Sequence, residues 1–154
     1  MCVLRAFGSR FAANRFAART SLPIVTVYKR GEPRLRSKPR GARHQYSGIT
    51  AVVSDASWSD LQAQARDAVR FLVKHNREIR RLSRLPGVDE LVLDFPIDLR
   101  IGARSVAQFD RLPATLVWNA GRLGLALELS IYGPSRSRQG RKTAPPKKRL
   151  SRRR

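Results

Sequence analysis

Charge is distributed very unevenly along this chain, and the distribution limits which part can form a folded core. The net charge is +21, yet residues 48–134 hold 11 basic and 10 acidic residues and are nearly neutral. Residues 1–47 hold 11 basic residues and the single acid Glu32, and residues 135–154 hold 10 basic residues and no acid. Because a large net charge opposes compaction, we expect a near-neutral folded body with two cationic ends.

Length and composition fit one domain followed by a tail. A chain of 154 residues is within the usual size of a single domain. We predict one α+β domain over residues 1–134, with a solvated basic loop at 34–47. Residues 135–154 are rich in Arg and Lys and poor in apolar side chains, a composition that predicts a disordered tail.

Cysteine and histidine are too scarce for a zinc site or an internal disulfide. Cys2 is the one cysteine, and the chain has two histidines, so we predict no metal and no cofactor. No apolar run approaches the roughly 20 residues of a membrane span, so we expect no membrane association and a cytoplasmic location. The alternative is targeting to an organelle, because the first 24 residues hold four Arg and no acid.

The first half of the chain predicts short strands and one long helix. Residues 2–7, 23–29 and 48–54 are β-compatible, and residues 11–19 favour a short helix. Ser59 with Gln62 three residues later fits a capping box, which predicts a helix start. A helix of about 25 residues should follow and end at Pro86-Gly87. Its apolar stripe consists of Leu61, Ala65, Ala68, Leu72, Ile79 and Leu82.

Apolar and polar residues alternate in the segment 88–101, which predicts a strand with one buried face. The predicted buried side chains are Leu91, Leu93, Phe95, Ile97, Leu99 and Ile101. Pro96 indicates an edge position, a bulge or a break into two pieces. The other face of this strand carries Asp94 and Asp98.

A helix that starts at Pro113 and stops at Gly124 is predicted next. Its apolar stripe consists of Leu116, Val117, Ala120 and Leu123. In the strand that follows, residues 125–132, we expect Leu125, Leu127, Leu129 and Ile131 to point inward. A right-handed crossover would make this strand parallel to the one before the helix.

The order of elements predicts the fold class. It reads β-α-β-β-α-β, the ferredoxin-like order, followed by an extra α-β. We therefore expect an α+β two-layer sandwich in which helices cover one face of a mixed sheet.

Several stretches resemble a family of small bacterial α+β proteins without an assigned function. They are residues 1–5, Arg30-Gly31-Glu32-Pro33, Ser47-Gly48, residues 53–56, residues 67–72, Leu93-Asp94-Phe95 and residues 127–132. The resemblance covers about residues 1–133 and excludes the arginine-rich tail. The family carries no established reaction, cofactor or partner, so the resemblance implies no catalytic residues here.

Three carboxylates on the expected polar sheet face form one candidate site. Asp94 and Asp98 would lie roughly 13 Å apart at about 3.3 Å per residue, too far for a pair of catalytic carboxylates. Glu128 could lie beside one of them if the two strands pair in parallel. The group could hold a cation or a proton, or it could belong to a solvated polar face that binds a protein partner.

The basic loop and the tail form the second candidate site, for RNA or DNA. Contacts between such cations and phosphates release counterions, so binding would weaken steeply with salt. The tail has no aromatic residue to stack on bases, and it could equally be a solubilising extension. The candidate contacts are Arg36, Lys38, Arg40, Arg43, Arg141, Lys142, Lys147, Lys148, Arg149, Arg152, Arg153 and Arg154.

We find no pattern that names a reaction, so we expect no catalytic residues. His75 lies at the border of the long helix's apolar stripe and is interpreted as a half-buried helical side chain. A small non-enzymatic binding or interaction module is the preferred hypothesis. The alternatives are a protein associated with RNA or DNA and a small enzyme that uses the carboxylates.

Overall fold

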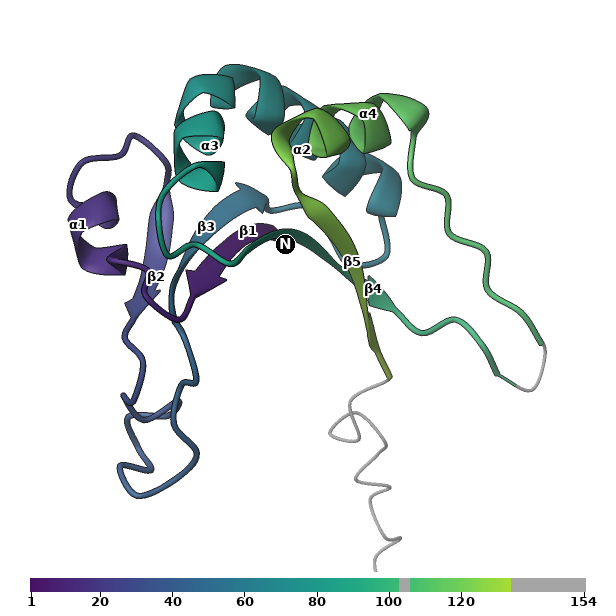
Figure 1. Ribbon diagram of the computed structural model, residues 1–154. Helices are drawn as coiled ribbons and strands as arrows, with labels where there is room; N and C mark the ends of the chain where they lie inside the picture. Colours follow the sequence, from purple (N-terminus) through teal and green to yellow (C-terminus); the bar gives the residue numbers. More distant parts are fainter. Residues whose placement is uncertain (103–105, 134–154) are drawn as a thin grey trace, which may run out of the picture.

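The computed structural model describes residues 1–102 and 106–133. They form an α+β structure with a five-stranded mixed sheet and four helices (Figure 1). In chain order the elements are β1 (Cys2–Gly8), α1 (Ala13–Ala17), β2 (Ile24–Tyr28), β3 (Ser47–Ser54), α2 (Leu61–Lys74), α3 (Asn76–Ser83), β4 (Glu90–Asp98), α4 (Ala114–Leu123) and β5 (Ala126–Tyr132).

The strands lie in the order β2-β3-β1-β4-β5, so the N-terminal strand is at the centre of the sheet. β1 pairs antiparallel with both β3 and β4, and β2 pairs antiparallel with β3. β5 pairs parallel with β4, which confirms the expected parallel pair. The connection between these two strands contains α4, as parallel neighbours need a crossover.

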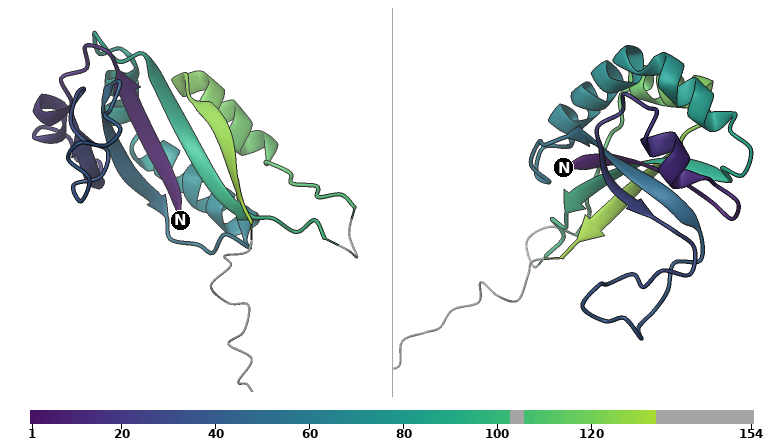
Figure 2. Two further views of the ribbon diagram at one scale, coloured as in Figure 1. Left: turned by 90° about the horizontal axis from the view of Figure 1, so that it is seen from below. Right: turned by 90° about the vertical axis from the view of Figure 1, so that its left-hand side faces the viewer.

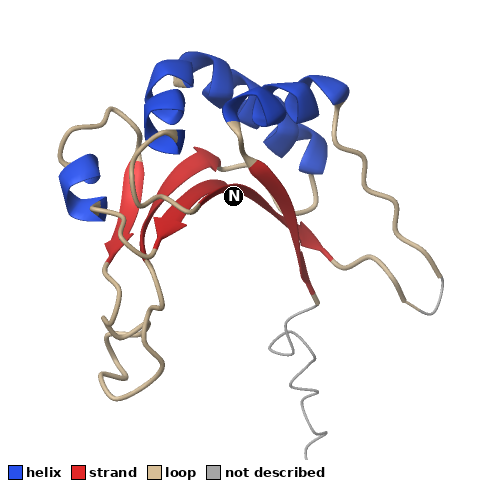
Figure 3. Ribbon diagram, in the orientation of Figure 1, coloured by secondary structure: helices blue, strands red, loops and turns tan. Residues whose placement is uncertain are grey.

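Helices α2, α3 and α4 form a second layer over one face of the sheet (Figures 1 and 3). The short helix α1 packs near β2 and β3 instead. The view from below shows the strands in front of this helical layer (Figure 2, left). Among the described residues, no helix covers the opposite face of the sheet, and the loop between β2 and β3 extends below it (Figure 1).

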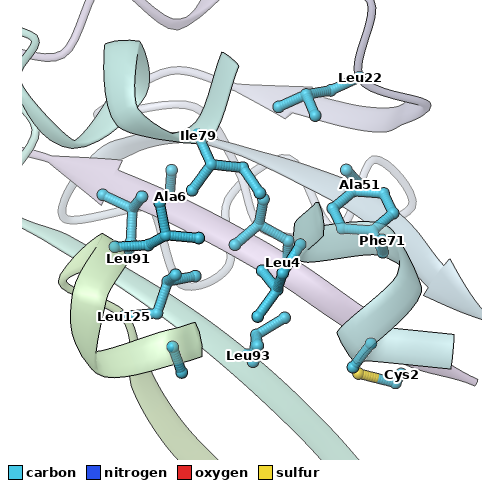
Figure 4. Close-up of a cluster of buried hydrophobic side chains, with 14 of the residues drawn as sticks. Cys2, Leu4, Ala6, Leu22, Ala51, Phe71, Ile79, Leu91, Leu93 and Leu125 are labelled. Carbon is cyan, nitrogen blue, oxygen red and sulfur yellow. The ribbon is translucent and has the colours of Figure 1, made fainter. Parts of the chain in front are cut away.

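Alternation along the strands sends one set of side chains into the core between the two layers. From β1, the side chains of Cys2, Leu4 and Ala6 are fully buried, and Leu93 lies opposite Leu4 on β4. Ile79 of α3 is also fully buried in this cluster (Figure 4). All six members of the apolar stripe predicted for the long helix are buried.

The predicted long helix is two helices, and its start is capped by a different residue. Asp60, not Ser59, caps α2, because its Oδ1 accepts the N–H of Ala63 at 2.8 Å. His75 then separates α2 from α3 with a φ of −103° and a ψ of 18°. Its ring packs against Phe71 with centroids 4.6 Å apart. The two helices still keep their apolar residues on the sheet, as predicted.

The alternation of apolar and polar residues predicts too many buried side chains at the ends of strands and at the edge of the sheet. Leu99 and Ile101 lie beyond β4 and are exposed, contrary to the prediction. On β5, Leu129 and Ile131 are also exposed, because this strand is at the edge of the sheet. Val117 of α4 is exposed as well.

Pro96 neither breaks β4 nor lies on an edge strand. The pairing of β4 with β1 ends at Asp94, two residues before Pro96. On the other side, Pro96 is opposite Ser130 in the parallel pair with β5. Proline has no N–H to donate, but at Pro96 this costs no hydrogen bond to β1, because β1 no longer pairs with β4 there. Its carbonyl accepts from the buried side chain of Gln64 at 3.0 Å, which ties α2 to the end of β4.

Candidate functional site

The helix-free face of the sheet gathers the sequence-predicted carboxylates with side chains that were not predicted. Register places Arg5 of β1 opposite Val92 of β4, and Asp94 opposite Glu128 of β5. Since residues two apart along a strand share a face, Arg5, Asp94 and Glu128 all lie on the side away from the helices. We call the face of the sheet that carries Arg5, Asp94 and Glu128 the open face.

Arg5 joins the two carboxylates at the centre of the open face. Its Nη2 lies 2.6 Å from Oε2 of Glu128 and 3.5 Å from Oδ2 of Asp94. The Ser130 hydroxyl donates to Oδ1 of Asp94 at 2.6 Å. Asp94 is the most buried of the three charged groups, with 14% of its side chain exposed against 49% for Glu128. The group is therefore a partly desolvated ion-pair network.

Asp98 lies apart from this network. It is opposite Tyr132 in the β4–β5 register, whereas Asp94 is opposite Glu128. Of the three predicted carboxylates, the structure thus brings two together and leaves the third four residues along the strand. Among residues 1–102 and 106–133, no three His, Cys, Asp or Glu side chains are gathered closely enough to hold a metal ion.

An aromatic cluster lies at one end of the open face, beside the loop between β2 and β3. The rings of Tyr28 and His44 stack with centroids 4.2 Å apart, and those of Phe7 and Tyr46 lie 5.8 Å apart. With Arg5, they line a hollow of about 240 Å³. Burial raises the pKa of Tyr28, and the positive charge of Arg5 opposes that rise. The tyrosine hydroxyl is therefore a neutral hydrogen-bonding group in this hollow.

Gly48 explains how Tyr28 can lie flat across the sheet. The two residues are opposite each other in the β2–β3 register. A Cβ atom on Gly48 would lie 2.3 Å from the Tyr28 Oη, so only glycine leaves room for the ring. The sequence contained this signal as a glycine at the start of a strand, but nothing in the pattern indicated which ring covers it.

A second aromatic pair lies at the β4–β5 end of the open face. Trp58 stacks on Tyr132 with ring centroids 4.6 Å apart. Trp58 precedes α2, and its carbonyl accepts the N–H of Asp98 at 3.4 Å. Both rings are exposed. The open face therefore has charged side chains at its centre and aromatic side chains at both ends.

The predicted basic loop is a hydrogen-bonded excursion whose cations are exposed. Its two sides are joined by a bridge between Pro33 and Arg43. Gly31 donates its N–H to the His44 carbonyl at 2.8 Å, and the Arg43 guanidinium donates to the Gly31 carbonyl at 2.6 Å. The other predicted phosphate contacts of the loop, Arg36, Lys38 and Arg40, are exposed.

The predicted contacts in the tail lie outside the described residues. They are Arg141, Lys142, Lys147, Lys148, Arg149, Arg152, Arg153 and Arg154.

Cys2 is a packing residue of the central strand. Its side chain is fully buried, and burial, together with the charge of Asp94, strongly raises the pKa of its thiol. A thiol in this state is not a nucleophile at neutral pH. Residues 2–8 form β1 at the centre of the sheet, so the arginine-rich N-terminal segment belongs to the folded body.

Comparison with known proteins gives no independent identification: no family model, curated protein or solved structure matches this chain. The resemblance to small bacterial proteins remains a prediction. Within the described ranges, no helix combines the length and the apolar content needed to cross a lipid bilayer.

Proposed function

We propose that this protein is a non-enzymatic binding module and that the open face is the surface that binds a partner protein. The observation that carries the proposal is the ion-pair network of Arg5, Asp94 and Glu128 on a sheet face without helices, between two aromatic clusters. Aromatic residues and arginine are enriched at protein interfaces, where the rings supply buried area, and complementary charges supply specificity.

The charges of this surface favour one kind of partner. The β4–β5 half carries Asp94, Asp98 and Glu128, and Arg5 pairs with Asp94 and Glu128. The loop at the other end carries Lys29, Arg30, Arg34, Arg36, Lys38, Arg40 and Arg43, with the single acid Glu32. A complementary partner presents a basic patch beside an acidic one. A second copy of this chain, related by a two-fold axis, presents such a basic patch beside an acidic one.

The carboxylates have weaker support as catalysts. Asp94 accepts from Ser130 and pairs with Arg5, and Glu128 pairs with the same arginine. These contacts hold both carboxylates within the sheet face. This geometry supports a structural and recognition role for both groups.

The fold is further proposed to be ferredoxin-like over β1 to β4. The order β2-β3-β1-β4 with antiparallel neighbours supports this arrangement, because β3 lies between β1 and β2 and splits the first β-α-β unit. In this view, β5 extends the sheet beside β4 and enlarges the open face. The cytoplasmic location and the alternative of organelle targeting stay predictions.

The proposal is tested by comparing two variants of the full chain as baits in the native host. Glu128→Lys reverses a charge on the open face, and Lys74→Glu reverses a charge on the exposed side of α2. We expect the unmodified chain and Lys74→Glu to retain the same stoichiometric partner protein, and Glu128→Lys to lose it. Equal retention by both variants would contradict the proposal.

The second candidate function is association with RNA or DNA through the basic loop and the tail. The exposed cations of the loop favour it. Replacing Arg36, Lys38 and Arg40 by Gln should then weaken binding to a single-stranded RNA and reduce its salt dependence by about 0.7 per lost phosphate contact. Unchanged binding would remove the loop from this function.

A further inference from the structure

A second charged surface lies on the helical side of the molecule. The near-neutral net charge of residues 48–134 gives no indication of it. Arg77, Arg80, Arg81 and Arg84 follow one another along α3 and its C-terminal end. Residues three and four apart on a helix are neighbours, and like charges at these spacings repel one another. The pairs Arg77–Arg81 and Arg80–Arg84 have this spacing, so the sequence carries an unfavourable local arrangement.

The acids around α3 neutralise only part of this charge. Glu78 lies 3.6 Å from Arg81, but its other carboxylate oxygen accepts the Thr20 hydroxyl at 2.8 Å. Asp89 accepts the N–H of Ser9, and Glu90 lies near the C-terminal end of α3. Arg80 has a buried Nε without a hydrogen-bond partner among the described residues. A buried donor of this kind costs free energy unless water or a bound group pairs with it.

Arginines from the neighbouring helices enlarge the surface. Arg15 and Arg19 come from α1 and its end, and Arg122 comes from α4. Three adjoining hollows of about 400, 420 and 530 Å³ surround α3, and each is lined by at least one α3 arginine. We call the seven arginines Arg15, Arg19, Arg77, Arg80, Arg81, Arg84 and Arg122 the α3 surface.

Stabilisation of the helix end accounts for only part of the α3 surface. Cations in the last turn interact favourably with the helix dipole, which explains Arg80 and Arg81. Arg77 lies in the first turn, where the same dipole disfavours a cation. The arginines of α1 and α4 belong to other helices altogether.

We propose that the α3 surface binds the phosphate backbone of a single-stranded nucleic acid. Guanidinium groups bind phosphate through paired hydrogen bonds, which a compact ammonium group does not provide. Arg77 and Arg84 are separated by about 10 Å along the helix at 1.5 Å per residue. Arg80 and Arg81 lie between them on the same side of α3. The four guanidinium groups therefore form a row that is long enough to contact more than one phosphate of a strand.

An exposed ring beside the α3 surface supports a single strand rather than a duplex. Trp118 is 58% exposed, and the Arg122 guanidinium lies 4.3 Å from the centre of its ring. Unpaired bases stack on such rings. This surface lies on the helical side and uses neither the open face nor the basic loop, so the inference is independent of the proposed partner protein.

The test is a titration of a fluorescent 12-nucleotide RNA without secondary structure, with the full chain at several salt concentrations. The variant is Arg77→Gln with Arg84→Gln, since both side chains are exposed. The matched control is Arg66→Gln with Lys74→Gln, which removes the same charge from exposed positions of α2. Thermal unfolding of both proteins verifies that the fold is retained.

We expect the α3 variant to bind about tenfold more weakly and to lose about 1.4 from the slope of log K against log salt. The control should stay within about twofold of the unmodified chain. A third variant, Arg77→Lys with Arg84→Lys, keeps the charge and should lie between the two. Equal weakening in the Gln variant and the control would overturn the proposal. Displacement of the RNA by an equimolar polyglutamate peptide would overturn it as well.

Discussion

The Arg5 guanidinium lies 2.6 Å from the Glu128 carboxylate and thereby joins β1 to β5 across the intervening strand β4. Asp94 on that intervening strand shares the same guanidinium at 3.5 Å. One arginine of the central strand therefore holds three strands together on the face that has no helical cover.

Replacing Arg5 by Met should lower the free energy of unfolding by about 1–3 kcal/mol. The change leaves Asp94 without a cation while 14% of its side chain is exposed, and an unpaired, partly buried charge is costly. Urea denaturation measures the change. Arg70→Met is the control, because Arg70 is 75% exposed in its pair with Asp67 and should cost less than about 1 kcal/mol. Equal losses in the two variants would show that the network stabilises the fold no more than an exposed ion pair does.

The start of α2 gives a second prediction, which distinguishes two adjacent residues. Asp60→Ala should destabilise the protein by about 1 kcal/mol, because the Asp60 carboxylate accepts the Ala63 N–H. Ser59→Ala should have little effect, since the Ser59 hydroxyl bonds to that of Ser57 and, among the described residues, does not cap the helix. Chemical denaturation of both variants decides between Asp60 and the residue expected from the capping-box pattern. A larger loss for Ser59→Ala would refute the observed cap.

Two glycines three residues apart in and after α4 should respond to alanine with opposite signs. Gly124 has a φ of 69°, so Gly124→Ala should cost about 1 kcal/mol through backbone strain. Gly121 lies inside the helix with open space around the position of a Cβ atom. Gly121→Ala should therefore stabilise the protein by about 0.5–1 kcal/mol. Melting temperatures of the two variants check the signs, and a shift in the same direction for both would contradict this account.

His75 predicts a loss of stability in mild acid. Burial, together with the positive charge of Lys74, lowers the pKa of His75 below its ordinary value of 6.5. The unfolded chain therefore takes up a proton first as the pH falls through about 6.5, and unfolding becomes more favourable until the folded pKa is reached. His75→Gln removes the titrating group, so its stability should vary less between pH 7.5 and 5. Parallel pH profiles for both proteins would refute this role.

The predicted order of elements and core rest on local patterns. Alternation in β4 placed Leu91, Leu93, Phe95 and Ile97 in the core correctly, because period two depends only on the strand itself. Exposure of Leu129 and Ile131 depends on the sheet edge, and that edge is set by pairing between distant segments. Helical periodicity does not record the break at His75, because the apolar residues of α2 and α3 keep their spacing across it and His75 still contacts Phe71 one turn earlier.

The candidate site was predictable only in part for the same reason. A parallel β4–β5 pair was enough to bring Glu128 beside Asp94. The partner of both carboxylates, Arg5, comes from a strand more than eighty residues earlier, and a single sequence gives no register between such strands. The stacks of Tyr28 on His44 and of Trp58 on Tyr132 join loops to strand ends, where periodicity has no meaning. The net charge of the folded body likewise did not indicate the α3 surface, because acidic residues elsewhere in the body offset the charge of its arginines.

Site-specific photo-crosslinking in the native host is the most direct measurement of whether the open face binds a partner protein. A photoreactive amino acid at Tyr132 reports on the open face, and one at Val73 reports on the exposed side of α2, where 63% of that residue is accessible. We predict that the Tyr132 position forms a discrete adduct with one protein, identified by mass spectrometry, and that the Val73 position does not. Nucleic acid adducts at Tyr132, or the same protein adduct from both positions, would contradict the account.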